Sequence, residues 1–397
     1  MTAREVRPGL TWVGAIDWER RLFDSLIPTP QGTTYNAYLL KGSQRTVLLD
    51  TVDATCLPAL LDHLHGVDRV DDIVIHHVEQ DHSGSLPFVM ERYPEARVLI
   101  SPKGREMLLD HLRVDAGRVE TVEDGATLDV GGRTLRFLLA PWQHWPETMM
   151  TYEETEGVLF SCDAFGGYGA LRGAIFDDEC TDPEFYRREA LRYYANIVAV
   201  FSRAVLQAID KLAGVPVSVV APSHGLIWRE RPGEIIDLYR QWARYATEPA
   251  EPGVTLIYGS MYGNTERMMN AVAQGISHEG LPLQIFDVTR THVSYILPSL
   301  WVYRGVMIGA PTYEGALFPP MAHVLDMAAQ KRVRDRMAAR FGSYGWSGGA
   351  QRHLERVLEG LKWQLAESFE FVGGPTEEDL KHGEEFGARF ARLVAAG

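Results

Sequence analysis

The stretch DDIVIHHVEQDHSG, residues 71–84, decides the fold of the first half of the chain. Its apolar beginning, Asp72–His76, predicts a buried strand. Four side chains that can bind a metal ion follow at once: His77, Glu79, Asp81 and His82. Burying imidazoles and carboxylates together without a metal is costly, so we interpret the stretch as part of a metal site. The alternative is a solvated polar turn.

Three other predicted strands of this half also end in candidate ligands. These are His144 after Thr134–Leu139, Asp163 after Gly157–Ser161, and His224 after Val217–Val220. A lone histidine after a strand is usually structural, but three strand ends together supply the ligand types that the first segment lacks. By strand alternation, His76 and Cys162 point away from this site. The longest helical pattern of this half, Pro183–Leu212, shows no chemistry and reads as core packing.

A second pattern begins after TEPAEPG, residues 247–253, whose composition is typical of a domain linker. From there on, five predicted strands alternate with helices; the strands are 254–258, 283–286, 305–308, 339–342 and 368–372. Such alternation predicts a doubly wound, parallel five-stranded sheet. We expect two domains, residues 1–250 and 251–397.

Glycine-rich loops follow the first, third and fourth of these strands, where ligands bind in doubly wound sheets. The first loop opens a helix whose free N–H groups favour a phosphate, and it lacks both GxxxxGK[ST] and GxGxxG, so a lone phosphomonoester fits best. The alternative is an ordinary capped helix. The candidate cofactor-binding residues are Ser260, Met261, Tyr262, Gly263, Asn264, Thr265, Pro311, Thr312, Tyr313, Glu314, Gly315, Ser343, Tyr344, Gly345, Trp346, Ser347 and Gly348.

The composition excludes several classes of function. The 397 residues include 39 basic and 53 acidic ones, and the net charge of −14 disfavours nucleic acid and anionic membranes as partners. The sequence has no apolar run long enough to span a bilayer and no secretory signal in MTAREVRPGL. The 3 cysteines form no CxxC pair, which excludes a rubredoxin-type module from this chain. We expect a cytoplasmic protein.

Each half of the chain resembles a known protein family. The three loops resemble those of flavodoxin, whose cofactor is FMN. The series HxExDH, His144, Asp163 and His224 resembles the metallo-β-lactamase fold, an αββα sandwich with a binuclear site at one edge. Hydrolases of that superfamily usually carry HxHxDH and bind zinc, whereas the carboxylate of Glu79 favours iron. Together the two halves resemble the flavodiiron proteins over essentially the whole chain.

The resemblance implies a ligand set, a reaction and partners. One iron takes His77, Glu79 and His144, the other takes Asp81, His82 and His224, and Asp163 bridges them. Members differ in whether the residue at the His82 position reaches the metal. Asp50 is either an outer partner of a ligating histidine or a turn residue. The implied reaction is reduction of O2 to water, of NO to N2O, or both, with electrons delivered through FMN.

The implied assembly is a head-to-tail homodimer or a dimer of such dimers, which brings the flavin of one subunit beside the irons of the other. The electron donor is then a separate rubredoxin, a flavin reductase or a reduced deazaflavin. Two alternatives stay open: a zinc hydrolase with a regulatory flavodoxin domain, and an electron-transfer module whose metal site has degenerated.

Overall fold

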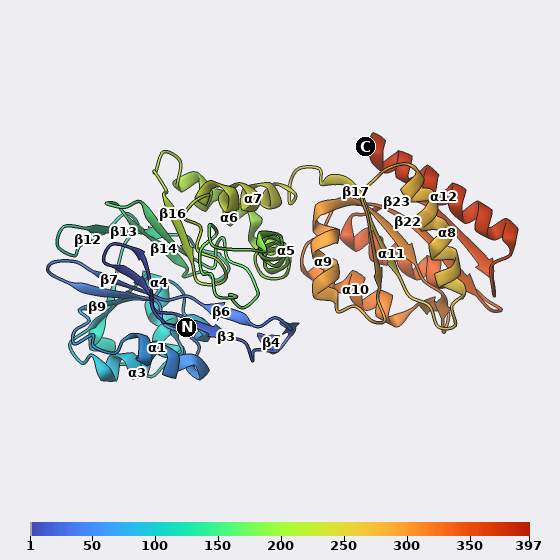
Figure 1. Ribbon diagram of the computed structural model, residues 1–397. Helices are drawn as coiled ribbons and strands as arrows, with labels where there is room; N and C mark the ends of the chain where they lie inside the picture. The colour runs from blue at the N-terminus through green and yellow to red at the C-terminus, as the bar shows by residue number, and fades with distance from the viewer. Residues whose placement is uncertain (1) are drawn as a thin grey trace. The chain divides into compact units, whose positions relative to one another are not determined.

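The computed structural model describes residues 2–397 and divides into two compact units, Met1–Ala243 and Arg244–Gly397 (Figure 1). Each unit has its own sheets and its own apolar core. Within the described residues, no helix is both long enough and apolar enough to cross a membrane. The domain bounds 1–250 and 251–397 stay a prediction.

The first unit is built on two sheets. The seven-stranded sheet has the order β1 (Arg4–Arg7), β2 (Leu10–Trp12), β7 (Tyr38–Lys41), β8 (Thr46–Leu49), β9 (Asp72–Val74), β10 (Arg97–Ile100), β11 (Val119–Thr121). The five-stranded sheet has the order β12 (Thr127–Asp129), β13 (Thr134–Leu139), β14 (Met149–Glu153), β15 (Val158–Cys162), β16 (Val219–Pro222). Two small ribbons add β3 (Ala15–Asp17) with β6 (Thr33–Tyr35) and β4 (Leu22–Phe23) with β5 (Ile27–Pro28).

Helices complete this unit on both sides of the paired sheets. They are α1 (Leu57–His63), α2 (Gln80–Ser83), α3 (Leu86–Arg92), α4 (Pro102–His111), α5 (Pro183–Tyr193), α6 (Ser202–Lys211) and α7 (Pro232–Arg244). Figure 1 shows α1 and α3 on one side and α6 and α7 on the other. The expected αββα sandwich is therefore confirmed.

The candidate ligands reach the site from both sheets. β9 lies inside the first sheet, parallel to β8 and β10, and its residues are buried on both faces, as expected of a central parallel strand. β13, β15 and β16 belong to the second sheet, where β15 and β16 run parallel. The ends of these strands thus form one edge of the sandwich.

The segment expected as one helix, Pro183–Leu212, is broken. α5 ends at Tyr193, a π-helical turn covers Tyr194–Val198, a 3-10 turn covers Ala199–Phe201, and α6 follows. Inside the π turn the Asn196 side chain donates to the carbonyl of Arg192, 2.8 Å away. Widened turns of this kind often occur at functional sites, and this one begins next to Tyr193, which contacts the metal site.

The second unit is a single parallel sheet with helices on both faces. Its strand order is β18 (Leu283–Asp287), β17 (Glu251–Tyr258), β19 (Tyr303–Gly309), β22 (Met337–Tyr344), β23 (Gln364–Val372). Its helices are α8 (Asn264–His278), α9 (Val293–Val302), α10 (Pro319–Gln330), α11 (Ala350–Leu361) and α12 (Glu377–Ala396). A hairpin of β20 (Thr312–Tyr313) and β21 (Ala316–Leu317) follows β19. This confirms the flavodoxin-like, doubly wound sheet.

Candidate metal centre

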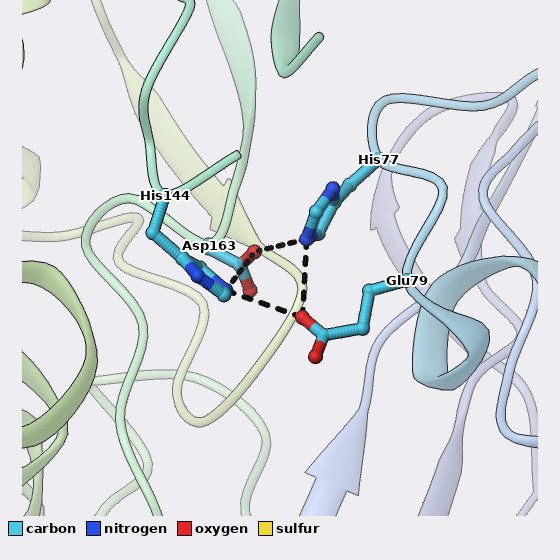
Figure 2. A group of neighbouring side chains, drawn as sticks. All are labelled: His77, Glu79, His144 and Asp163. Atoms are coloured by element: carbon cyan, nitrogen blue, oxygen red, sulfur yellow. Dashed lines mark hydrogen bonds and ion pairs between the residues drawn. The ribbon is translucent and has the colours of Figure 1, made fainter. Parts of the chain in front are cut away.

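All seven candidate ligands of the first unit converge. The ligand atoms of His77, Glu79, His144 and Asp163 lie within 4.8 Å of one another (Figure 2). Those of Asp81, His82 and His224 form a second group by the same measure. Four imidazoles and three carboxylates thus gather from the loop and the short helix α2 that follow β9, and from the ends of β13, β15 and β16.

The first group is centred on two carboxylate oxygens. Glu79 Oε2 lies 3.1 Å from His77 Nε2 and 3.2 Å from His144 Nε2. Asp163 Oδ2 lies 3.6 Å and 3.8 Å from the same two nitrogens. Figure 2 shows the four side chains pointing toward one shared space.

The second group meets the other oxygen of the same aspartate. Asp163 Oδ1 lies 3.2 Å from His82 Nε2 and 3.3 Å from His224 Nε2. Asp81 completes the group, with its Oδ2 atom 3.2 Å from His224 Nε2 and its Oδ1 atom 3.4 Å from His82 Nε2. Oδ2 of Asp163 therefore faces one group and Oδ1 faces the other, so this carboxylate lies between the two groups.

Several buried polar atoms of this site lack a hydrogen bond within residues 2–397. They are both carboxylate oxygens of Asp81 and the Nε2 atoms of His82 and His224. A buried polar atom without a partner costs about 1–3 kcal/mol. Metal ions between these atoms would remove that cost, so the residues fit a metal pair. A mixed set of imidazoles and hard carboxylates suits iron better than zinc.

The charges of the site act on one another strongly. Burial lowers the pKa of His224, but the neighbouring carboxylates of Asp163 and Asp81 outweigh burial and raise it well above its ordinary value. Conversely, burial raises the pKa of Asp163, and the imidazoles around it lower that pKa well below its usual range. A cation is favoured in such a field, and its binding displaces protons from the imidazoles.

Outer partners fix two of the histidine rings. His77 Nδ1 lies 2.7 Å from Glu147 Oε1, and His224 Nδ1 lies 2.7 Å from the backbone carbonyl of Thr34. Each contact leaves Nε2 free to face a metal, which is the usual arrangement around a ligating histidine. The Tyr193 hydroxyl donates to Asp163 Oδ1 at 2.8 Å.

In the second unit, the three candidate loops lie at one edge of the sheet. β17, β19 and β22 are neighbours in the sheet. Near their C-terminal ends, Gly309 of β19 pairs with Tyr258 of β17 on one side and with Phe341 of β22 on the other, so the loops that follow these strands start close together. The first and third loops meet where the hydroxyls of Thr265 and Ser343 lie 3.4 Å apart.

The second and third loops also pack closely. A Cβ added to Gly349 would lie 2.1 Å from the carbonyl oxygen of Gly315, so this approach requires glycine. Two aromatic side chains of the loops extend outward, with Tyr262 91% and Trp346 95% exposed. Closely packed backbone with exposed aromatic rings, next to the N-terminus of α8, fits a flat ring system that carries a phosphate.

Comparison with known proteins gives both units a family. The family model "ODP family beta lactamase" matches residues 33–225, and the model "Flavodoxin" matches residues 256–387. The anaerobic nitric oxide reductase flavorubredoxin of Escherichia coli (strain K12) is 34% identical over 399 residues, which cover 98% of this chain and 82% of that protein. The chain belongs to the flavodiiron protein family.

Solved flavodiiron structures agree with this assignment. Rubredoxin oxygen:oxidoreductase from Desulfovibrio gigas is 31% identical, with a TM-score of 0.92 over 99% of both chains. The flavodiiron protein from Giardia intestinalis is 27% identical, with a TM-score of 0.93 over 100% of this chain and 97% of that one. The cofactors are therefore FMN and a non-haem diiron centre, and the zinc-hydrolase alternative is set aside.

Of the two roles left open for Asp50 in this flavodiiron protein, the structure agrees with the turn residue: its φ is 57°, and its carboxylate lies 2.7 Å from the Nδ1 atom of His76, which is not a candidate ligand. The prediction for Cys162 is wrong: it does not point away from the site, because its sulfur lies 3.9 Å from Asp163 Oδ2. Its φ of 56° interrupts strand alternation at the last residue of β15. His76 does point away, toward Thr151.

A cavity of about 410 Å³ opens onto the diiron ligands of this flavodiiron protein. Glu79 and Asp81 line it from the metal side, and Trp145 and His111 line it from another. His111, the last residue of α4, lines the cavity although no sequence motif marks it. The cavity has ample room for a diatomic molecule.

Proposed function

We propose that this flavodiiron protein reduces O2 to water, NO to N2O, or both, at its diiron centre. The observation that carries the proposal is Asp163, whose two oxygens face two separate groups of nitrogen and oxygen ligands. Hydrolysis requires no flavin, and electron transfer alone requires no metal pair with a substrate cavity. Relatives named as a nitric oxide reductase and as an oxygen oxidoreductase support both substrates.

In this proposal each side chain has a defined task. His77, Glu79 and His144 would hold one iron, Asp81, His82 and His224 would hold the other, and Asp163 would be shared between them. When bound, the iron pair and FMN supply the electrons for the reduction. Glu147 and the Thr34 carbonyl orient the rings of His77 and His224. FMN is held by Ser260–Thr265, Pro311–Gly315 and Ser343–Gly348, within a domain of residues 251–397 that follows a diiron domain of residues 1–250.

The proposal extends to partners. A head-to-tail homodimer, or a dimer of such dimers, places the flavin of one subunit beside the irons of its partner. The proposed donor is a rubredoxin, a flavin reductase or a reduced deazaflavin. The names of two relatives include rubredoxin, which supports that donor class. The three unpaired cysteines support a reducing, cytoplasmic setting.

The test is anaerobic reduction of the purified protein, followed by stopped-flow mixing with O2 and, separately, with NO. We expect rapid reoxidation of flavin and iron by at least one gas, and iron rather than zinc by metal analysis. Asp163→Ala should abolish the rapid phase, whereas His65→Ala, at an exposed position, should not. Slow reoxidation of the wild-type protein by both gases would overturn the proposal.

A further inference from the structure

A fully buried cation lies inside the flavodoxin-like unit. Arg340, in the middle of β22, is 0% exposed. Its strand neighbours Ala339 and Phe341 belong to the apolar core that contacts α8 and α12, so the Arg340 side chain extends to the opposite face of the sheet. Removing a guanidinium from water is costly unless a partner compensates its charge.

The compensating partner comes from the neighbouring strand. Arg340 Nη1 donates to Glu370 Oε1 on β23 at 2.9 Å and to Gln351 Oε1 on α11 at 3.2 Å. Nε has no hydrogen-bond partner among residues 2–397. Burial lowers the pKa of Arg340, and the carboxylate of Glu370 opposes that change. The Glu370 side chain is 26% exposed.

Both members of this pair touch loops of the candidate flavin site. Arg340 Nη2 donates to the carbonyl of Ala310, directly before Pro311, at 3.3 Å. A Cβ added to Gly342 would lie 2.6 Å from Arg340 Nη2, and one added to Gly348 would lie 3.3 Å from Glu370 Oε2. The pair is therefore packed against the second and third loops.

We propose that Arg340 and Glu370 are positioning residues for FMN that set its reduction potential through opposite charges. The inference rests on the proposed FMN site. A flavin becomes more negative when it accepts electrons, so a nearby cation stabilises the reduced form and a nearby carboxylate disfavours it. Removing one charge leaves the other uncompensated, and the two removals act in opposite directions.

The test uses the full-length holoprotein and single variants of both members of the pair. Arg340→Gln should lower the FMN midpoint potential, and Glu370→Gln should raise it. Each should change the ratio of the Kd values for oxidised and reduced FMN by about tenfold, which is about 30 mV for a two-electron couple. The double variant should return close to the wild-type potential.

Arg336→Gln is the matched control. Arg336 is also buried, at 3% exposure, but it lies just before β22, at the end of the strand away from the loops. It donates to the backbone carbonyls of Leu300 and Trp301. This variant should lose stability and keep the wild-type potential.

The outcomes separate the pair's role from a general loss of folding. Shifts of the same sign in Arg340→Gln and Glu370→Gln, or no shift in either, would overturn the inference. If Arg340→Gln does not fold, Glu370→Gln and the charge-retaining Arg340→Lys still decide it: the first must raise the potential and the second must keep it. A wild-type protein that binds no FMN would instead refute the proposed function.

Discussion

Glu147→Gln tests whether an outer carboxylate tunes the diiron site. Glu147 Oε1 accepts from His77 Nδ1 at 2.7 Å and from the backbone N–H of Val78 at 3.0 Å, while its Oε2 atom is buried without a partner. Glutamine keeps one oxygen for both bonds but removes the charge. A hydrogen bond to a charged group contributes about 1.5–3 kcal/mol, against about 0.5–1.5 for a neutral pair, so the loss is about 1 kcal/mol or more.

A loss of about 1 kcal/mol corresponds to roughly fivefold weaker iron binding and a loss of about 1.4 kcal/mol to tenfold, which is the lower end of the range for outer-partner substitutions. The assay is anaerobic titration of the apoprotein with Fe(II) against a competing chelator. Glu153→Gln is the matched control, because Glu153 is equally buried but accepts from the N–H groups of Thr155 and Glu156, outside the site. Equal iron affinity in the wild type and Glu147→Gln, or equal losses in both variants, would refute the reasoning.

Three further outcomes are expected. Asp163→Ala should prevent stable loading of two irons, measured as iron per chain, because both ligand groups lose an oxygen. Acidification should weaken Fe(II) binding. Burial lowers the pKa of His77 and of His224, but the neighbouring carboxylates outweigh burial and hold both pKa values well above the ordinary value. Protons on these imidazoles therefore compete with the metal at low pH, and the competition disappears as pH rises and the imidazoles lose their protons. Calorimetry in buffers of different ionisation enthalpy measures the protons released. Trp346→Ala should weaken FMN binding by up to about tenfold, measured by fluorescence titration, because the variant loses an aromatic ring that can stack on the flavin. The same variant should keep the thermal stability of the wild type, because the Trp346 side chain is 95% exposed.

The strands that carry the ligands could be predicted because their sequences are apolar and bounded by polar turns. The expected bounds agree with β13, whereas β9 ends two residues earlier than expected, β15 is shifted by one residue and β16 by two. α9, Val293–Val302, had no such signal, since it is apolar almost all round and contains Pro298. A helix buried on most sides shows no 3.6-residue periodicity to read.

The prediction of one long helix over Pro183–Leu212 was wrong for a different reason. The apolar residues of this segment do recur at helical spacing, but that spacing cannot show where one turn contains an extra residue. The π-helical turn at Tyr194–Val198 separates α5 from α6, next to Tyr193, which contacts Asp163. Local pattern predicted the helices here, and tertiary contacts decided where they break.

The side chains that support the metal ligands are positioned by the backbone conformation of single residues, which the sequence pattern does not reveal. The rule that side chains alternate between the two faces of a strand holds only for extended residues. Asp50 and Cys162 are not extended, because their φ angles are 57° and 56°. These turns direct the Asp50 carboxylate to His76 and bring the Cys162 sulfur to Asp163. Glu147, three residues after His144, takes the role that Asp50 was a candidate for, through contacts across the fold. Ligands at strand ends are therefore readable from sequence, whereas their supporting partners are set by left-handed residues and long-range packing.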